Sequence, residues 1–131
     1  MSADMQIDSI PKGMPIRVTI IDNVSGDCWT NSETILEETA KFFQDNGIVV
    51  RDDPDGLIFE ITVGGGSYNG TCYVVYKSLI IQRTVSEVFG EVPLLLGSTV
   101  GSHVSGEGPL DEKIESKVAD FARGTVRLYA D

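Results

Sequence analysis

Residues 57–63 read LIFEITV, and the apolar side chains at every second position from Leu57 onward have the period of a β-strand. The glycine-rich segment 64–70, GGGSYNG, predicts a flexible turn after it, and Cys72 to Thr84 reads as a long returning strand. The two strands therefore form a β-hairpin. Apolar groups stand on both faces of the returning strand: Tyr73, Val75, Leu79 and Ile81 on one, Val74, Tyr76 and Ile80 on the other. This pattern predicts a central strand, or a strand whose second face is covered by a partner.

The segment before the hairpin predicts one strand and one helix. Ile16 to Ile20 alternates apolar and polar residues, as a half-buried strand does. A helix is predicted to begin near Thr30 and Glu33, which have the spacing of a capping box, with Asn31 and Ser32 as competing cap residues. Its apolar residues recur at helical spacing: Ile35, Leu36, Ala40 and Phe43. Asn46-Gly47 is expected to end this helix.

The segment after the hairpin predicts a last strand and a second helix. Leu94 to Gly101 is the expected strand, and Val85 to Val92 is a connection. Pro109 stands just before a second, amphipathic helix, and Asp111 is expected to be its cap or an acidic residue of its first turn. Its apolar face consists of Ile114, Val118, Phe121, Ala122 and Val126.

These elements predict an α+β fold: a single, mainly antiparallel sheet of about four strands with two helices packed on one face, in the order β-α-β-β-β-α. The helix after the first strand allows a right-handed crossover, and one face of the sheet is expected to stay open. Residues 1–14 are expected to form a polar, poorly ordered N-terminal lead, and residues 15–131 a single domain without repeats or linkers.

Composition excludes several classes of protein. The chain has 131 residues, 41% of them hydrophobic, so it can bury a core without metals or additional crosslinks. Twenty acidic and ten basic residues give a net charge of −10, which argues against nucleic-acid and membrane-surface binding. No apolar run is long enough to span a membrane. Residues 1–14 lack the pattern of a signal peptide, so the protein is cytosolic or its export signal has been removed.

Cys28 and Cys72 are the two cysteines, and three interpretations of them are open. They form a disulfide, or one is a catalytic thiol, or both are buried and reduced. A catalytic thiol needs a base, and His103 in its Ser/Gly-rich segment is the only histidine. A deep polar pocket containing His103 and Asp22 would favour a ligand-binding or enzymatic domain.

Other chemistry finds little support in the sequence, and we expect no cofactor and no metal. One histidine with two distant cysteines does not supply a zinc site. The carboxylates Asp52, Asp53 and Asp55 lack the spacing of a calcium loop and are typical of a turn. The three glycines from Gly64 lead into a strand, whereas a phosphate-binding loop leads into a helix.

The order of Cys28-Trp29-Thr30-Asn31, a helix ending in Asn46-Gly47-Ile48, and Thr71-Cys72 after a glycine-rich turn resembles uncharacterised bacterial exported proteins. More loosely, the element order is similar to the small N-terminal domain of the translocation protein TolB. The resemblance implies periplasmic or secreted localisation and protein partners, and it brings no catalytic residues. The two-sided apolar strand from Cys72 to Thr84 and the missing catalytic set favour a noncatalytic domain that binds a protein partner or forms a homo-oligomer. A possible interaction surface comprises Trp29, Tyr68, Asn69 and Tyr76. The alternatives are a ligand-binding or enzymatic domain that uses the His103 loop, and a cytosolic protein with reduced cysteines.

Overall fold

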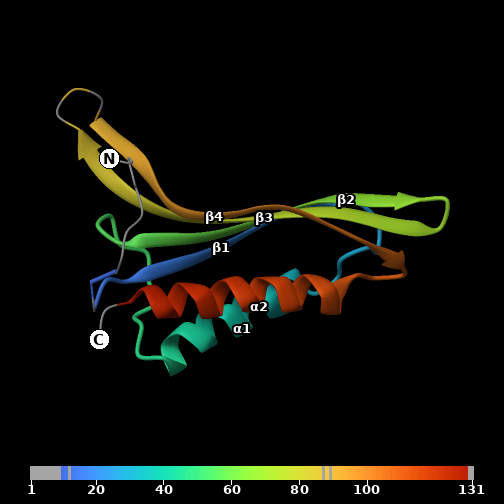
Figure 1. Ribbon diagram of the computed structural model, residues 1–131, viewed down its shortest axis with the longest axis horizontal. Helices are drawn as coiled ribbons and strands as arrows, with labels where there is room; N and C mark the ends of the chain where they lie inside the picture. The colour runs from blue at the N-terminus through green and yellow to red at the C-terminus, as the bar shows by residue number, and fades with distance from the viewer. Residues whose placement is uncertain (1–9, 12, 87, 89, 130–131) are drawn as a thin grey trace.

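The computed structural model describes residues 10, 11, 13–86, 88 and 90–129, and of residues 83–86 and 90–103 the backbone alone. Four strands and two helices follow one another as predicted. Their bounds are β1 Ile16–Val24, α1 Ser32–Asp45, β2 Leu57–Tyr68, β3 Thr71–Ser86, β4 Gly90–Glu107 and α2 Asp111–Leu128. Both helices lie side by side on one side of the sheet (Figure 1). The α+β fold with one sheet and two helices is confirmed.

The strands lie in the order β1-β2-β3-β4. β1 is parallel to β2, with Ile16 opposite Leu57, because α1 carries the chain back to the start of the sheet. The β2-β3 and β3-β4 pairs are antiparallel, so the sheet is mixed. β1 and β4 are its two edge strands, and these pairings make them run in the same direction.

The core lies between the sheet and the helices because alternate side chains of each strand point to the same face. On β2 the buried side chains are Leu57, Phe59, Ile61 and Val63. The Phe59 ring lies 5.2 Å from that of Phe43 in α1 and 5.1 Å from that of Phe121 in α2. This one strand residue therefore joins both helices to the sheet.

Helix α1 begins and ends where the sequence suggested, but its predicted capping box is not formed. Asn31 is the N-cap residue and makes no side-chain capping hydrogen bond. The backbone N–H of Thr30 donates to Asp111 at the start of α2 (2.8 Å), and the Thr30 hydroxyl donates to the same carboxylate. Thr30 thus ties the two helix starts together. The helix ends at Asn46 and Gly47, whose φ of 79° suits glycine.

The sequence had predicted a turn over the whole glycine-rich segment 64–70. In the structure only the end of this segment is a turn. β2 continues to Tyr68, and the turn consists of Asn69 (φ 51°) and Gly70 (φ 80°), the pair of positive φ angles of a two-residue hairpin turn. Gly65 has φ 140°, and a Cβ there would overlap the carbonyl oxygen of Tyr73. Glycine is therefore needed at position 65 for close approach of β2 and β3.

β4 is longer than predicted and takes in part of the expected connection. It runs from Gly90 to Glu107 and has register shifts opposite Tyr76–Ser78 and Ile80–Ile81. β2 pairs with β3 only as far as Gln82, whereas Ser86 still pairs with Gly90. The end of the β3-β4 hairpin is consequently a two-stranded ribbon that projects beyond the helices (Figure 1).

Residues 1–9 and 12 of the predicted N-terminal lead lie outside the described residues. Ile10 is 2% exposed, and its N–H bonds to the carbonyl of Leu128 at the end of α2. The Tyr129 hydroxyl donates to the Met14 carbonyl (3.0 Å), and burial raises the pKa of Tyr129 to about 12. The segment just before β1 is thereby attached to the C-terminal helix.

Candidate interaction surfaces

The two cysteines form a disulfide at one end of the sheet. Cys28 and Cys72 have Cα atoms 5.6 Å apart and are buried, at 1% and 6% exposed. The N–H of Leu110 donates to the Cys28 carbonyl (2.8 Å), so the loop after β1, the start of β3 and the start of α2 meet here. Because the two sulfur atoms are buried and bonded to each other, their arrangement is that of a structural disulfide.

The predicted interaction surface has to be redrawn. Trp29 and Tyr76 are 4% and 3% exposed and belong to the buried core, so neither presents a surface. Tyr68 is 71% exposed, and Asn69 is exposed beside it at the hairpin turn. Two of the four predicted residues therefore remain available for contacts.

The face of the sheet that the helices leave uncovered carries an apolar patch. Tyr73 and Val75 on β3 are 52% and 44% exposed, and Tyr68 lies on the same face of β2. Gly66 stands opposite Tyr73 and Gly64 opposite Val75, so no neighbouring side chain on β2 shields them. We call Tyr68, Tyr73 and Val75 the open-face patch. The sequence had separated the two faces of β3 correctly but could not show which one the helices cover.

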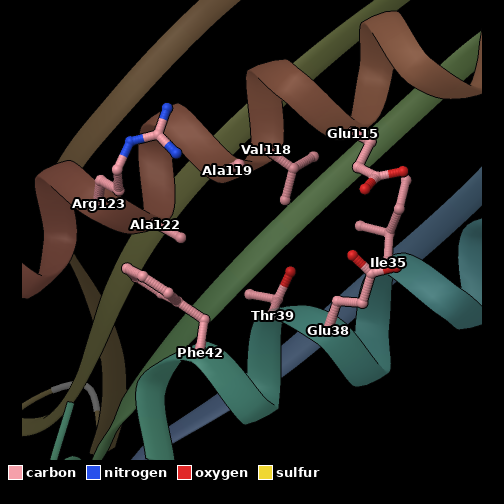
Figure 2. A pocket seen from close by; sticks show the side chains of 9 residues that line it. All are labelled: Ile35, Glu38, Thr39, Phe42, Glu115, Val118, Ala119, Ala122 and Arg123. Atoms are coloured by element: carbon pink, nitrogen blue, oxygen red, sulfur yellow. The ribbon is translucent and has the colours of Figure 1, made fainter. Parts of the chain in front are cut away.

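A groove of about 240 Å³ runs between the outer surfaces of α1 and α2. Phe42, Val118 and Ala122 supply apolar walls, Glu38 and Glu115 stand at one end, and Arg123 lies at the other (Figure 2). Its volume is below the range of roughly 300–1,000 Å³ usual for small-molecule pockets. The groove is therefore a poor fit for a cofactor or a drug-sized ligand.

Glu38 and Glu115 repel each other across this groove. The negative charge of Glu38 is the largest cause of the raised pKa of Glu115, followed by desolvation of the Glu115 carboxylate. Asn31 donates to Glu115 at 3.4 Å, which compensates little. The charge of Glu38 therefore opposes ionisation of Glu115 in the folded state.

The residues of the predicted His103 site are not brought into a described pocket. His103 lies within β4, with its backbone opposite Val75, and its side chain lies outside the described part. Asp22 is exposed and accepts a hydrogen bond from the Val24 N–H (3.0 Å). Asp22 thus has a local structural role at the end of β1.

The acidic segment at Asp52–Asp55 is a turn in the structure. Asp53 accepts hydrogen bonds from the Asp55 N–H (2.9 Å) and from Arg51, and these bonds, in that order of size, lower the pKa of Asp53. Over the described residues no cluster of histidine, cysteine and carboxylate side chains suits a metal ion. Among these residues, neither helix is apolar enough over a sufficient length to cross a membrane.

The two lateral sides of the molecule present different charged side chains from their helices. On the β1 side, Glu33 and Glu37 are exposed on α1 and, in the part of the chain that is described, make no ion pair. On the β4 side, Lys113 and Lys117 of α2 line a shallow groove with Val104 and Ser105 of β4. The Lys113 ammonium donates to the Ser105 carbonyl (2.8 Å), which holds it along β4.

Comparison with known proteins shows a shared fold. No family model and no curated protein sequence matches the chain. A PelC variant from Paraburkholderia phytofirmans, solved as a dodecamer, matches with a TM-score of 0.51 and 14% identity over 96% of this chain and 95% of that chain. Lipoprotein GNA1162 from Neisseria meningitidis has a TM-score of 0.46 and 13% identity, over 86% of this chain and 97% of that chain. These proteins are bacterial, and neither comparison tests the similarity to TolB, which stays a prediction.

Proposed function

We propose that the chain is a noncatalytic domain that works outside the cytoplasm by assembling with further copies of itself. The observation that carries this proposal is the pair of free sheet edges. Within the described residues, β1 pairs with β2 and with Val50 at a single bridge, and β4 pairs with β3 alone. Edge strands present unpaired N–H and C=O groups that favour pairing with another chain.

The projecting ribbon supports self-assembly. Beyond Gln82 no third strand pairs with the β3-β4 hairpin among the residues that the structure describes, and an isolated two-stranded ribbon is marginally stable in water. Contact with a neighbouring copy would supply the missing support. The PelC relative in fold is a dodecamer, so this fold is compatible with assembly.

The disulfide supports export. Disulfides persist in oxidising compartments and are rare in the cytosol. Cys28 and Cys72 are buried and have the geometry of a bonded pair. The resemblance to bacterial exported proteins points to the same setting. The periplasm or the extracellular medium is the proposed location.

Sedimentation velocity of the oxidised protein over a broad range of concentrations tests self-assembly. We expect species larger than the monomer whose proportion rises with concentration. A monomer at every concentration would overturn the proposed function.

The open-face patch favours a second candidate, a domain that binds a different protein through the uncovered sheet face. Exposed aromatic and apolar side chains gathered on one face are typical of binding surfaces. Val75→Lys tests the patch, because Val75 is 44% exposed on the uncovered face. Under the leading proposal this variant assembles like the wild type. Loss of assembly in Val75→Lys would show that the copies meet through the open face.

A further inference from the structure

We infer that the copies assemble head to tail, with the α1/β1 side of one copy against the α2/β4 side of the next. This inference rests on the proposed self-assembly and adds the surface, the polarity and the charged residues that specify it. The occupant of each side is a second copy of this chain.

The α1/β1 side is an apolar seam with an acidic border. Glu38 and Phe42 line the groove facing α2, so the helical repeat places Leu36 and Ala40 on the opposite side of α1. Both are half-buried, as are Val18 and Ile20 on the helix-facing side of β1. Glu33 and Glu37, one helical turn apart, border this seam.

The α2/β4 side is a groove with a basic border. Glu115 and Ala119 line the groove facing α1, so Lys113 and Lys117 turn to the β4 side, where both contribute to the second groove. Val104 forms part of that groove and is 7% exposed. Glu112 also lines it, and the nearby carboxylate of Asp120 is already paired with Arg123.

The two sides complement each other in charge and in strand direction. Glu33 and Glu37 have the same one-turn spacing as Lys113 and Lys117, and opposite charges across a contact fix its orientation. Since β1 and β4 run in the same direction, β4 of one copy next to β1 of another continues the sheet as a parallel pair. A contact between two different surfaces forms a ring if its rotation closes and a filament if it does not.

Charge reversal provides the test. Glu33→Lys/Glu37→Lys makes the α1 side basic, so that both sides are basic, and Lys113→Glu/Lys117→Glu makes both sides acidic. Each variant alone is expected to associate about 100-fold more weakly than the wild type, because like charges then face each other. Equimolar mixing is expected to restore assembly, since basic and acidic sides alternate in a mixed assembly. The variant with all four substitutions is expected to assemble by itself.

Sedimentation velocity and native mass spectrometry measure assembly, and circular dichroism confirms that each variant is folded. The control is Lys41→Glu/Arg127→Glu, which has the same charge change as Lys113→Glu/Lys117→Glu at exposed positions that line neither groove. We expect this control to assemble as the wild type does. Glu33→Lys/Glu37→Lys lowers the net negative charge of the chain and is still expected to dissociate. This outcome separates a specific contact from general charge repulsion.

The outcomes distinguish the inference from the proposed function. A monomeric wild type overturns both. An assembling wild type whose single-side variants assemble equally well overturns the head-to-tail contact and leaves self-assembly standing. Folded single-side variants that stay apart after mixing also overturn the charge pairing.

Discussion

Removal of the disulfide is expected to lower stability strongly. Replacing both cysteines, Cys28→Ala with Cys72→Ala, opens a loop closed over a sequence separation of 44 residues. Loop-closure entropy for this length corresponds to about 4 kcal/mol of unfolding free energy at 25 °C. For a chain of this size that loss corresponds to a fall in Tm of roughly 10–20 °C. The cause is the larger conformational freedom of the unfolded chain.

Urea unfolding of three samples measures this effect: oxidised wild type, reduced wild type and the double alanine variant. The reduced protein keeps both sulfur atoms, so its difference from the oxidised protein isolates the crosslink. Its difference from the variant isolates the packing of two buried side chains. Oxidised and reduced wild type that unfold within about 1 kcal/mol of each other would refute the entropic argument.

Three further predictions concern local features. Glu115→Gln is expected to raise the free energy of unfolding at pH 7 by a few tenths of a kcal/mol, because repulsion from Glu38 raises the pKa of Glu115 in the folded state. That gain in stability should disappear as the pH falls below 4.5, the ordinary pKa of a glutamate, because Glu115 then becomes protonated in the folded and the unfolded state. Urea titrations of variant and wild type at pH 7 and pH 4 measure it. A stability difference that is the same at both pH values would contradict the reasoning. Gly65→Ala should lower the free energy of unfolding by about 2 kcal/mol or more, because position 65 has a φ of 140° and the added Cβ would overlap β3. Gly124→Ala should raise the free energy of unfolding by about 0.5–1 kcal/mol, because there is open space around its Cβ in α2. Thermal unfolding of the two variants checks both signs. Phe59→Ala should cost about 3–5 kcal/mol in chemical denaturation, since this fully buried ring contacts a phenylalanine of each helix, and a loss below 1 kcal/mol would contradict the central place of Phe59 in the core.

The fold was predictable where one periodic signal dominated. The alternation of residues 57–63 and the amphipathic pattern of α2 depend on which side chains are buried, and burial drives both elements to form. The sequence failed where local preference and tertiary pairing disagree. Gly64 to Gly66 favour a turn by propensity, yet pairing with β3 keeps them in a strand, and Asn69-Gly70 alone forms the turn.

The candidate surface was less predictable because it depends on which sheet face the helices cover. Residues of β3 alternate between two apolar faces, so periodicity could not distinguish Tyr73 from Tyr76. Cys72 carried the missing signal. Its bond to Cys28 is buried beside the start of α2, and Tyr76, four residues on, shares its face of the strand while Tyr73 does not.

The polarity of the proposed assembly follows from the single parallel pairing in the sheet. If all four strands were antiparallel in sequence order, the two edge strands would run in opposite directions. The crossover through α1 makes β1 parallel to β2, so β1 and β4 run in the same direction. Copies that follow one another by the same translation or rotation can then continue the sheet, with β4 of one copy next to β1 of the next. Every copy uses both sides. The same crossover places α1 over the β1 side and leaves α2 over the β4 side, which separates the glutamates from the lysines. One feature of the chain path therefore determines both the strand direction and the charge arrangement on which head-to-tail contact depends.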